Sequence, residues 1–174
     1  MLKTALLKLV PVILGLASGG SGKNALTEDH PVMVRADARA AEIIEVVEAM
    51  VTDPVQQETW KRALFGWEFW EAAWHVNPPG ANDNGDAHGV MQMHAPENII
   101  PGVTGAMLRK DAKLAVKVAL TYLLEREKAC GSKAAAWTAY STDGSCRSKP
   151  MKLVQYRCKR VGLTAACELP VEKK

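Results

Sequence analysis

The segment from Asp111 to Lys128, DAKLAVKVALTYLLEREK, constrains the fold more than any other part of the chain. Its apolar residues recur at helical spacing and cover most of the helix circumference; they are Ala112, Ala115, Val116, Ala119, Leu120, Tyr122 and Leu123. A helix that is apolar on most sides is buried, so other elements have to surround it. We therefore expect a mainly α domain in which this helix is central.

Four other segments carry helical signals that supply those partners. Apolar residues follow helical spacing from about residue 36 to 51. Asp53 before a proline is a strong helix start, and we expect a helix over 54–75 that ends at NPPG. A shorter helix is expected at 133–140 and a last one at 150–162.

Composition agrees with one ordinary globular domain. The 174 residues are 48% hydrophobic and 24% charged, and the formal charge is +3. No lysine or arginine run forms a stripe along which a nucleic acid would bind, so we expect no nucleic-acid partner. Oligomeric state stays open.

The N-terminal residues have the layout of a secretory signal. A basic start precedes an apolar stretch, Leu6–Leu16, that is too short to span a bilayer comfortably, and small residues follow. Lys8 and a proline interrupt the stretch, so a core or amphipathic helix is the alternative. We expect a signal peptide or anchor at 1–22, a linker at 23–35 and one domain at 36–174, exported to the periplasm or outside the cell.

Four cysteines lie in the last third of the chain. An even number in an exported chain favours disulfides, and the spacings of 15, 11 and 8 intervening residues match no zinc template. Four cysteines allow three pairings, and we expect neighbours in sequence to pair. The alternative is four buried thiols in a reducing cytosol. The four are Cys130, Cys146, Cys158 and Cys167.

One carboxyl falls on the apolar face of the helix expected over 54–75. At 100° per residue, Glu71 lies near the middle of the face that carries Trp60 and Trp67. A carboxyl among tryptophans loses hydration and binds its proton more tightly, which a general acid in glycoside cleavage requires. Glu68, about 60° away on the flank, is the alternative acid. In the alternative without a functional role, Glu71 lies at the end of the helix and its carboxyl faces solvent.

The stretch NDNGDAHGVMQMH, Asn82–His94, sets a polar turn directly before a short apolar run. Asn84 and Gly85 tolerate positive φ, so the turn can be tight, and Gly89 lets backbone approach a ligand. Gln92 offers a donor and an acceptor to an amide-bearing sugar. The alternative is a surface hairpin whose apolar residues pack in the core, namely Val90, Met91 and Met93.

Three motifs occur in order: EAAWHVNP from Glu71, DNGDAHGVMQM from Asp83 and AAWTAYS from Ala135. Together they resemble the lysozyme superfamily, in its soluble lytic transglycosylase and goose-type lysozyme branch. The resemblance covers roughly Pro54 to Gly144, about half of the chain. It implies an α+β lysozyme-like fold, a helical domain with a small loop or short-strand region that forms one wall of a cleft.

The resemblance assigns a role to each matching residue. Glu71 matches the general acid, and the remaining matches are expected to bind substrate: Trp74, Asp83, Gly89, Met91, Gln92 and Tyr140. Three positions depart from the family pattern. Ala72 stands where Ser follows the acid, Ser141 where Asn follows the tyrosine, and His94 where goose-type enzymes place a second Asp. Ser141 and Asp86 remain expected cleft residues, and Asp83 or Asp86 could position a water.

The function implied is cleavage of the β-1,4 bond between N-acetylmuramic acid and N-acetylglucosamine in peptidoglycan, by a lytic transglycosylase or a muramidase. The outcome, an anhydro-sugar or a reducing sugar, stays open. The expected partner is the glycan strand, with transient membrane contact through the N-terminus. The alternative is a non-catalytic wall-binding or virion-associated module on the same fold. Phage lysis, virion entry and assembly of an envelope-crossing machine all suit a bacteriolytic domain.

Metal and nucleophile chemistry have little support. His75, His88 and His94 lie within twenty residues, but no H-E-x-x-H or other recognised spacing occurs. No G-x-S-x-G nucleophile motif is present. We expect no metal and no cofactor.

Overall fold

The computed structural model describes residues 2–14, 27–76, 86–147 and 151–163. Over these ranges the chain is mainly α, as expected, and the extended pairing found there is one antiparallel bridge between His88 and Met93. The helices are α1 (Leu2–Leu7), α2 (Val10–Ile13), α3 (Pro31–Met50), α4 (Pro54–Ala72), the 3₁₀ helix η1 (Pro96–Asn98), α5 (Gly105–Leu108), α6 (Ala112–Cys130), α7 (Lys133–Tyr140) and α8 (Lys152–Arg160).

Side-chain caps explain where the long helices begin. Asp53 accepts a hydrogen bond from the Gln56 amide at 2.8 Å before α4, and Asp111 accepts one from the Leu114 amide at 2.9 Å before α6. The helix expected from residue 36 begins earlier, at Pro31, so the expected linker at 23–35 overlaps the first turn of α3. The sequence analysis did not anticipate η1 and α5, which are short.

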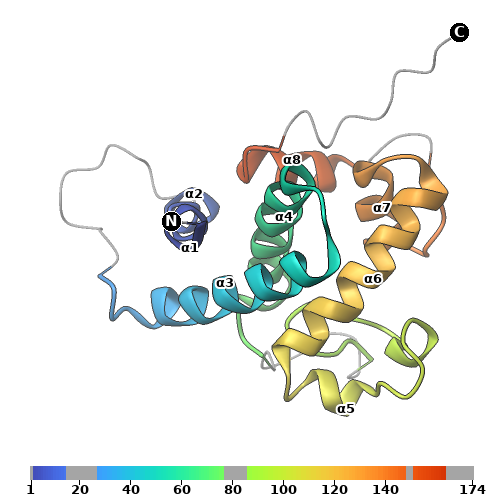
Figure 1. The fold of residues 1–174 in the computed structure, drawn as a ribbon, viewed down its shortest axis with the longest axis horizontal. Helices are drawn as coiled ribbons and strands as arrows, with labels where there is room; N and C mark the ends of the chain where they lie inside the picture. The colour runs from blue at the N-terminus through green and yellow to red at the C-terminus, as the bar shows by residue number, and fades with distance from the viewer. Residues whose placement is uncertain (1, 15–26, 77–85, 148–150, 164–174) are drawn as a thin grey trace, which may run out of the picture.

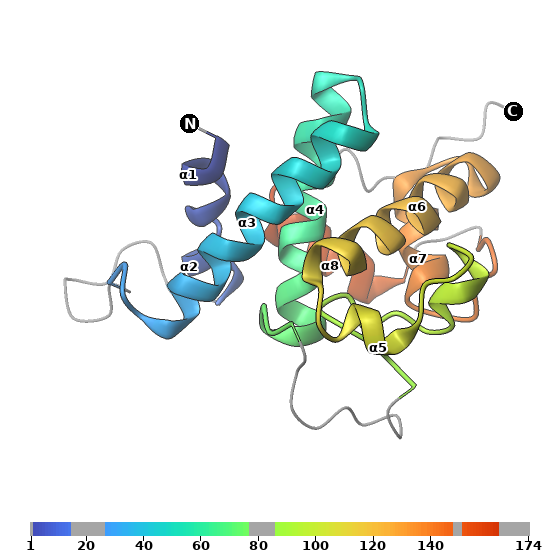
Figure 2. The ribbon, with the colours of Figure 1, turned by 60° about the horizontal axis from the view of Figure 1, so that its bottom comes forward.

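The helices pack around α6 and α4. Figure 1 shows α3 crossing α4, α6 running toward α7, and α8 spanning from α4 to α7, and these pairs are in contact. The segment between residues 86 and 111, which includes η1 and α5, gathers below α6 in Figure 2. This segment is the loop-rich region expected between the helices, and its role as one wall of a cleft stays a prediction.

Tryptophan rings fill the junction between α4 and α7. Trp67 stacks on Trp137 with ring centroids 3.9 Å apart, and Trp60 lies 6.2 Å from Trp137. All three rings are almost fully buried. Offset stacking of this kind stabilises a pair by about 0.5–1.5 kcal/mol beyond the area that it buries. The junction therefore fixes the end of α7 relative to α4.

The first two helices pack on the body of the domain. Leu6, Val10 and Ile13 are buried with the core, and Lys3 pairs with Asp37 of α3 at 2.7 Å. Among the described residues, no helix combines the length and apolar character needed to cross a bilayer. Whether residues 1–22 are a signal peptide stays a prediction.

One expected disulfide is confirmed. Cys130, at the end of α6, is bonded to Cys146, which follows α7. This bridge closes the α6–α7 hairpin, which carries the tyrosine of the third motif. Cys158 of α8 is also disulfide-bonded, and Cys167 lies outside the described residues.

Candidate functional site

The apolar run GVMQM forms a tight hairpin. The backbone amides of His88 and Met93 each donate to the other residue's carbonyl at 3.0 Å, and the Gln92 amide donates to the Gly89 carbonyl at 3.0 Å. Gln92 has φ of 50°, and its side-chain nitrogen also donates to that carbonyl at 2.8 Å. One of its amide hydrogens is thereby occupied, which leaves the other and the amide oxygen for a ligand.

Gly89 has a different physical role from the one expected. It adopts φ of 69°, and a Cβ built there would lie 2.6 Å from the backbone oxygen of Leu108. Glycine is therefore required because the turn passes close to α5. This close contact is with the protein backbone, whereas the expected contact was with a ligand.

Tyr140 connects the hairpin to α7. Its hydroxyl donates a hydrogen bond to the Met91 carbonyl, 49 residues away in sequence. Burial raises the pKa of Tyr140 well above its usual value, and the nearby charge of Glu71 raises it further. The hydroxyl therefore joins two segments that are separate in sequence, the hairpin and the end of α7.

Glu71 occupies an ion pair rather than an apolar pocket. Its Oε1 lies 2.5 Å from Nη1 of Arg157 on α8, and 24% of its side chain is exposed. The guanidinium also lies over the rings of Trp67 and Trp70, at 5.4 and 5.5 Å from their centroids. The tryptophans near Glu71 thus contact a cation. The expectation that these tryptophans surround the carboxyl was wrong, because the position of Arg157 could not be predicted from the sequence.

Glu68 is the carboxyl that is fully buried. Glu68 was expected on the flank of the helix, but 0% of the residue is exposed. Its two carboxyl oxygens have no hydrogen-bond partner among the described residues. Burial raises its pKa well above the usual range; Arg39 opposes this rise and Glu42 adds to it. Both belong to α3, so the packing of α3 on α4 decides which face of α4 is buried.

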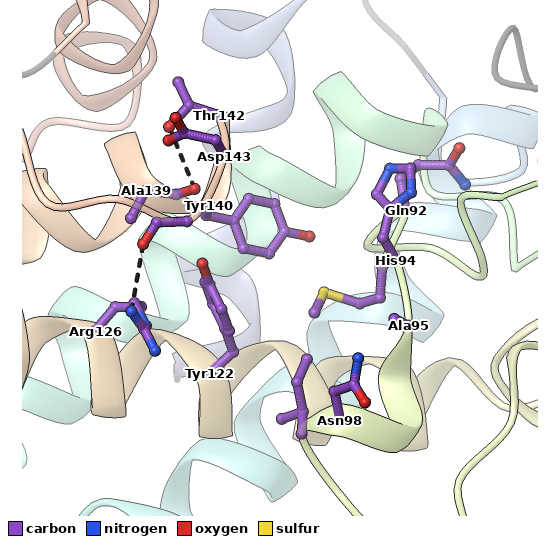
Figure 3. Close-up of a pocket in the computed structure, with 13 residues that line it drawn as sticks. Gln92, His94, Ala95, Asn98, Tyr122, Arg126, Ala139, Tyr140, Thr142 and Asp143 are labelled. Carbon is purple, nitrogen blue, oxygen red and sulfur yellow. Dashed lines mark hydrogen bonds between the residues drawn. The ribbon is translucent and has the colours of Figure 1, made fainter.

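A cavity of about 500 Å³ opens next to Tyr140 (Figure 3). This volume lies within the usual range for small-molecule sites. The rings of Tyr140 and Tyr122, with centroids 6.0 Å apart, lie on one side, and Gln92 and His94 lie on the other. The lining therefore combines aromatic faces with hydrogen-bonding groups.

Charged and amide groups complete the cavity. Asn98, Arg126 and Asp143 line it, and Arg126 donates to the Gly144 carbonyl at 3.3 Å. The sequence analysis did not single out these residues or Tyr122. Tyr122 and Arg126 lie four residues apart on α6, a spacing that places two side chains on one helix face and could have indicated a shared surface.

The other expected site residues divide into three groups. Trp74 and Met91 are buried, and the Trp74 indole donates to the Phe65 carbonyl at 3.0 Å, so their side chains support the site from the core. Asp86 is exposed, and the Ser141 hydroxyl is buried without a partner among the described residues. Asp83 lies outside the described residues, as do Asn84 and Gly85.

No group of three or more histidine, cysteine, aspartate or glutamate side chains is placed to hold a metal ion in the part of the chain that the structure describes. His88 packs against Gly105, where a Cβ would meet its ring at 2.1 Å. This histidine therefore has a packing role next to the hairpin.

Comparison of the chain with protein-family models, with curated proteins and with solved structures gives no match. Functional inference therefore depends on the residues and the geometry described above.

Proposed function

We propose that this protein cleaves the β-1,4 bond between N-acetylmuramic acid and N-acetylglucosamine in peptidoglycan, with Glu71 as the general acid. The observation that carries the proposal is the hydrogen bond from the Tyr140 hydroxyl to the Met91 carbonyl. It joins the second and third of the motifs whose order resembles the soluble lytic transglycosylases and goose-type lysozymes. The first motif begins with Glu71 on α4, which packs on α7 through the stacking of Trp67 on Trp137, and the charge of Glu71 raises the pKa of Tyr140.

The cavity next to Tyr140 supports the binding of an amide-bearing sugar. Gln92 keeps one amide hydrogen and its oxygen available, and Asn98 adds a second amide. The tyrosine faces supply apolar surface against which a sugar ring can pack. Tyr140 lines this cavity and the charge of Glu71 raises its pKa, whereas Glu71 itself is not one of the lining residues.

The chemistry requires one proton transfer to the leaving oxygen. A protonated Glu71 would give its proton to the glycosidic oxygen as the bond breaks. If the C6 hydroxyl of the substrate then attacks C1 and gives its proton to the Glu71 carboxylate, the product is an anhydro-sugar. If a water attacks C1 and gives its proton to a carboxylate, the product is a reducing sugar. Asp86 and Asp83 are the candidates to position that water, and both outcomes belong to the proposal.

Because the substrate lies outside the cytoplasmic membrane, we also propose that the protein is exported or carried in a virion. The layout of residues 1–22 supports export, and the disulfide at Cys130 and Cys146 supports an oxidising compartment.

The test is digestion of purified peptidoglycan by the parent protein and by Glu71→Gln. Because general acid catalysis contributes about 10²–10⁴-fold, we expect the variant to lose at least about 100-fold of the rate. Glu58→Gln is the matched control, because Glu58 is on the same helix and pairs with Arg62 at 2.7 Å on the solvent side. Equal rates for Glu71→Gln and the parent would refute the role of Glu71.

A second candidate function is a non-catalytic wall-binding or virion-associated module. The observation that favours it is the ion pair between Glu71 and Arg157, which occupies Oε1 of the carboxyl. Such a module would sediment with peptidoglycan and release no soluble fragment from it. The parent protein is expected to release fragments, and binding without release would select this second candidate.

A further inference from the structure

The ion pair between Glu71 and Arg157 is unusual for a general acid. The two residues are 86 positions apart, and their side chains are 24% and 11% exposed. A general acid has to direct an oxygen at the glycosidic oxygen of the substrate, whereas Oε1 of Glu71 is occupied by the Arg157 guanidinium. For the proposed reaction, some group therefore has to replace Glu71 at Arg157.

Arg157 has donors left for such a group. A guanidinium carries five N–H donors in a planar fork that suits carboxylates. Nη1 donates to Glu71, and the buried Nε donates to no acceptor among the described residues. The cation–π contacts with Trp67 and Trp70 hold the guanidinium in place, so the N–H groups that do not bond to Glu71 keep their direction.

The positive charge of α8 favours an anionic ligand. Arg157 shares this helix with Lys152, Lys159 and Arg160, and the helix contains no acidic residue. A local excess of positive charge raises the concentration of anions near it. The positive charge of α8 as a whole thus attracts anions, and Arg157 is the residue of this helix that contacts Glu71.

We propose that Arg157 is a specificity-determining residue that exchanges Glu71 for a carboxylate of the substrate. Binding of an anionic glycan occupies the guanidinium and releases Oε1 of Glu71 to face the glycosidic oxygen. Neutral glycans of the same linkage leave the pair closed and are cleaved slowly. This inference rests on the proposed function and names its substrate class: glycans that carry carboxylates, on the lactyl group or on the attached peptide.

The test compares three substrates of the same linkage type. The first is glycan strands with their peptides, the second is strands from which an amidase has removed the peptides and left the lactyl carboxylate, and the third is neutral N-acetylglucosamine oligomers. Since a charge-assisted hydrogen bond contributes about 1.5–3 kcal/mol, we expect the parent to prefer an anionic strand by about tenfold or more in kcat/KM. The preferred strand, with or without peptide, identifies the source of the carboxylate.

Arg157→Gln should remove the preference. We expect its kcat/KM on neutral oligomers to equal or exceed that of the parent, and its rate on anionic strands to fall, so that the ratio approaches one. Arg160→Gln is the matched control, because Arg160 is on the same helix and bonds to the Tyr156 hydroxyl. This control removes the same unit of charge from α8 and keeps the contact with Glu71, so its ratio should stay well above that of Arg157→Gln.

A second variant covers the case in which Arg157→Gln does not fold, since the guanidinium packs on two tryptophans. Arg157→Lys keeps the charge and loses the planar fork, so we expect a smaller ratio than that of the parent. The inference would be overturned if a folded Arg157 variant had the same ratio of kcat/KM on anionic and neutral glycans as the parent. It would also be overturned if the parent showed no preference for anionic glycans. An active Glu71→Gln would refute the proposed function instead, so the two failures are distinguishable.

Discussion

At the scale of single residues, two carboxyl groups on α4 lie one helical turn apart in opposite environments. Glu68 is buried against α3 without a hydrogen-bond partner among the described residues, and Glu71 reaches a cation on α8. An unpaired buried carboxylate is costly, so a carboxyl of this kind remains neutral over a wider pH range. Glu68 thus makes stability depend on pH, whereas the Glu71 side chain remains partly exposed.

Glu68→Gln should stabilise the protein as pH rises. The pKa of Glu68 is raised on folding above the ordinary 4.5, so the native state binds more protons than the unfolded chain above about pH 4.5. The parent therefore loses stability as pH rises from there toward the folded pKa, by at most about 1.4 kcal/mol per pH unit. Glutamine has no proton to lose.

Urea unfolding of the parent and Glu68→Gln between about pH 4.5 and 8 measures this effect. The advantage of the variant should grow with pH, and Glu58→Gln, at an exposed position, should show no such trend. A stability difference that stays constant over this range would show that Glu68 is not buried as described.

The residues of the site were predictable to different degrees. Tyr140, Gln92 and Glu71 could be chosen because local motifs contain them. The pairing of Glu71 with Arg157 could not, because it joins residues 86 positions apart through the packing of α8 on α4. The burial of Glu68 was not predicted because helical periodicity gives only the angles between side chains around the helix axis. Which side chains are buried depends on where α3 packs against α4.

At the scale of elements, the hairpin from His88 to Met93 depends on one glycine. Gly89→Ala would add a methyl group 2.6 Å from the Leu108 carbonyl oxygen, at φ of 69°. Gly102 is the matched control, because it has φ of 84° and no atom within 4 Å of its Cβ position. Both substitutions carry the cost of about 1–2 kcal/mol for a left-handed alanine, and Gly89→Ala adds about 1–3 kcal/mol of overpacking.

Chemical denaturation should therefore rank Gly89→Ala below Gly102→Ala in free energy of unfolding. If the hairpin is also a wall of the cleft, Gly89→Ala should reduce peptidoglycan cleavage more than Gly102→Ala at equal folded fraction. Equal stability of the two variants would contradict the close approach of the hairpin to α5.

The long elements were predictable because their signals are local. The helices α4, α6 and α7 begin close to the predicted residues, since caps and apolar spacing mark them. The start of α3 was placed late because His30 was not considered as a cap; its ring accepts from the Val32 amide at 3.2 Å. Short elements such as α5 contain too few residues to show a periodicity.

At the scale of the whole molecule, the N-terminal helices are part of the packed body. A protein that begins at residue 23 would lose the burial of Leu6, Val10 and Ile13. A fully buried side chain of this type contributes about 1.5–3 kcal/mol, and ordering the two helices offsets part of it. We expect the shortened protein to unfold cooperatively with a stability lower by roughly 2 kcal/mol or more.

Calorimetry of the full and shortened chains measures this difference. Equal midpoints would show that α1 and α2 contribute nothing to the folded domain, as expected if residues 1–22 act as a removable signal. Mass spectrometry of the protein recovered from cells then tells whether those residues are cleaved.

The proposed catalytic role of Glu71, at the end of α4, can be tested by one measurement. The measurement is the rate at which purified peptidoglycan releases soluble fragments, identified by mass spectrometry, with the parent, Glu71→Gln and Glu68→Gln at equal folded concentrations. This role predicts fragments cut between N-acetylmuramic acid and N-acetylglucosamine from the parent and from Glu68→Gln, and almost none from Glu71→Gln. Release by Glu71→Gln at the parent's rate, or loss of release only in Glu68→Gln, would contradict it.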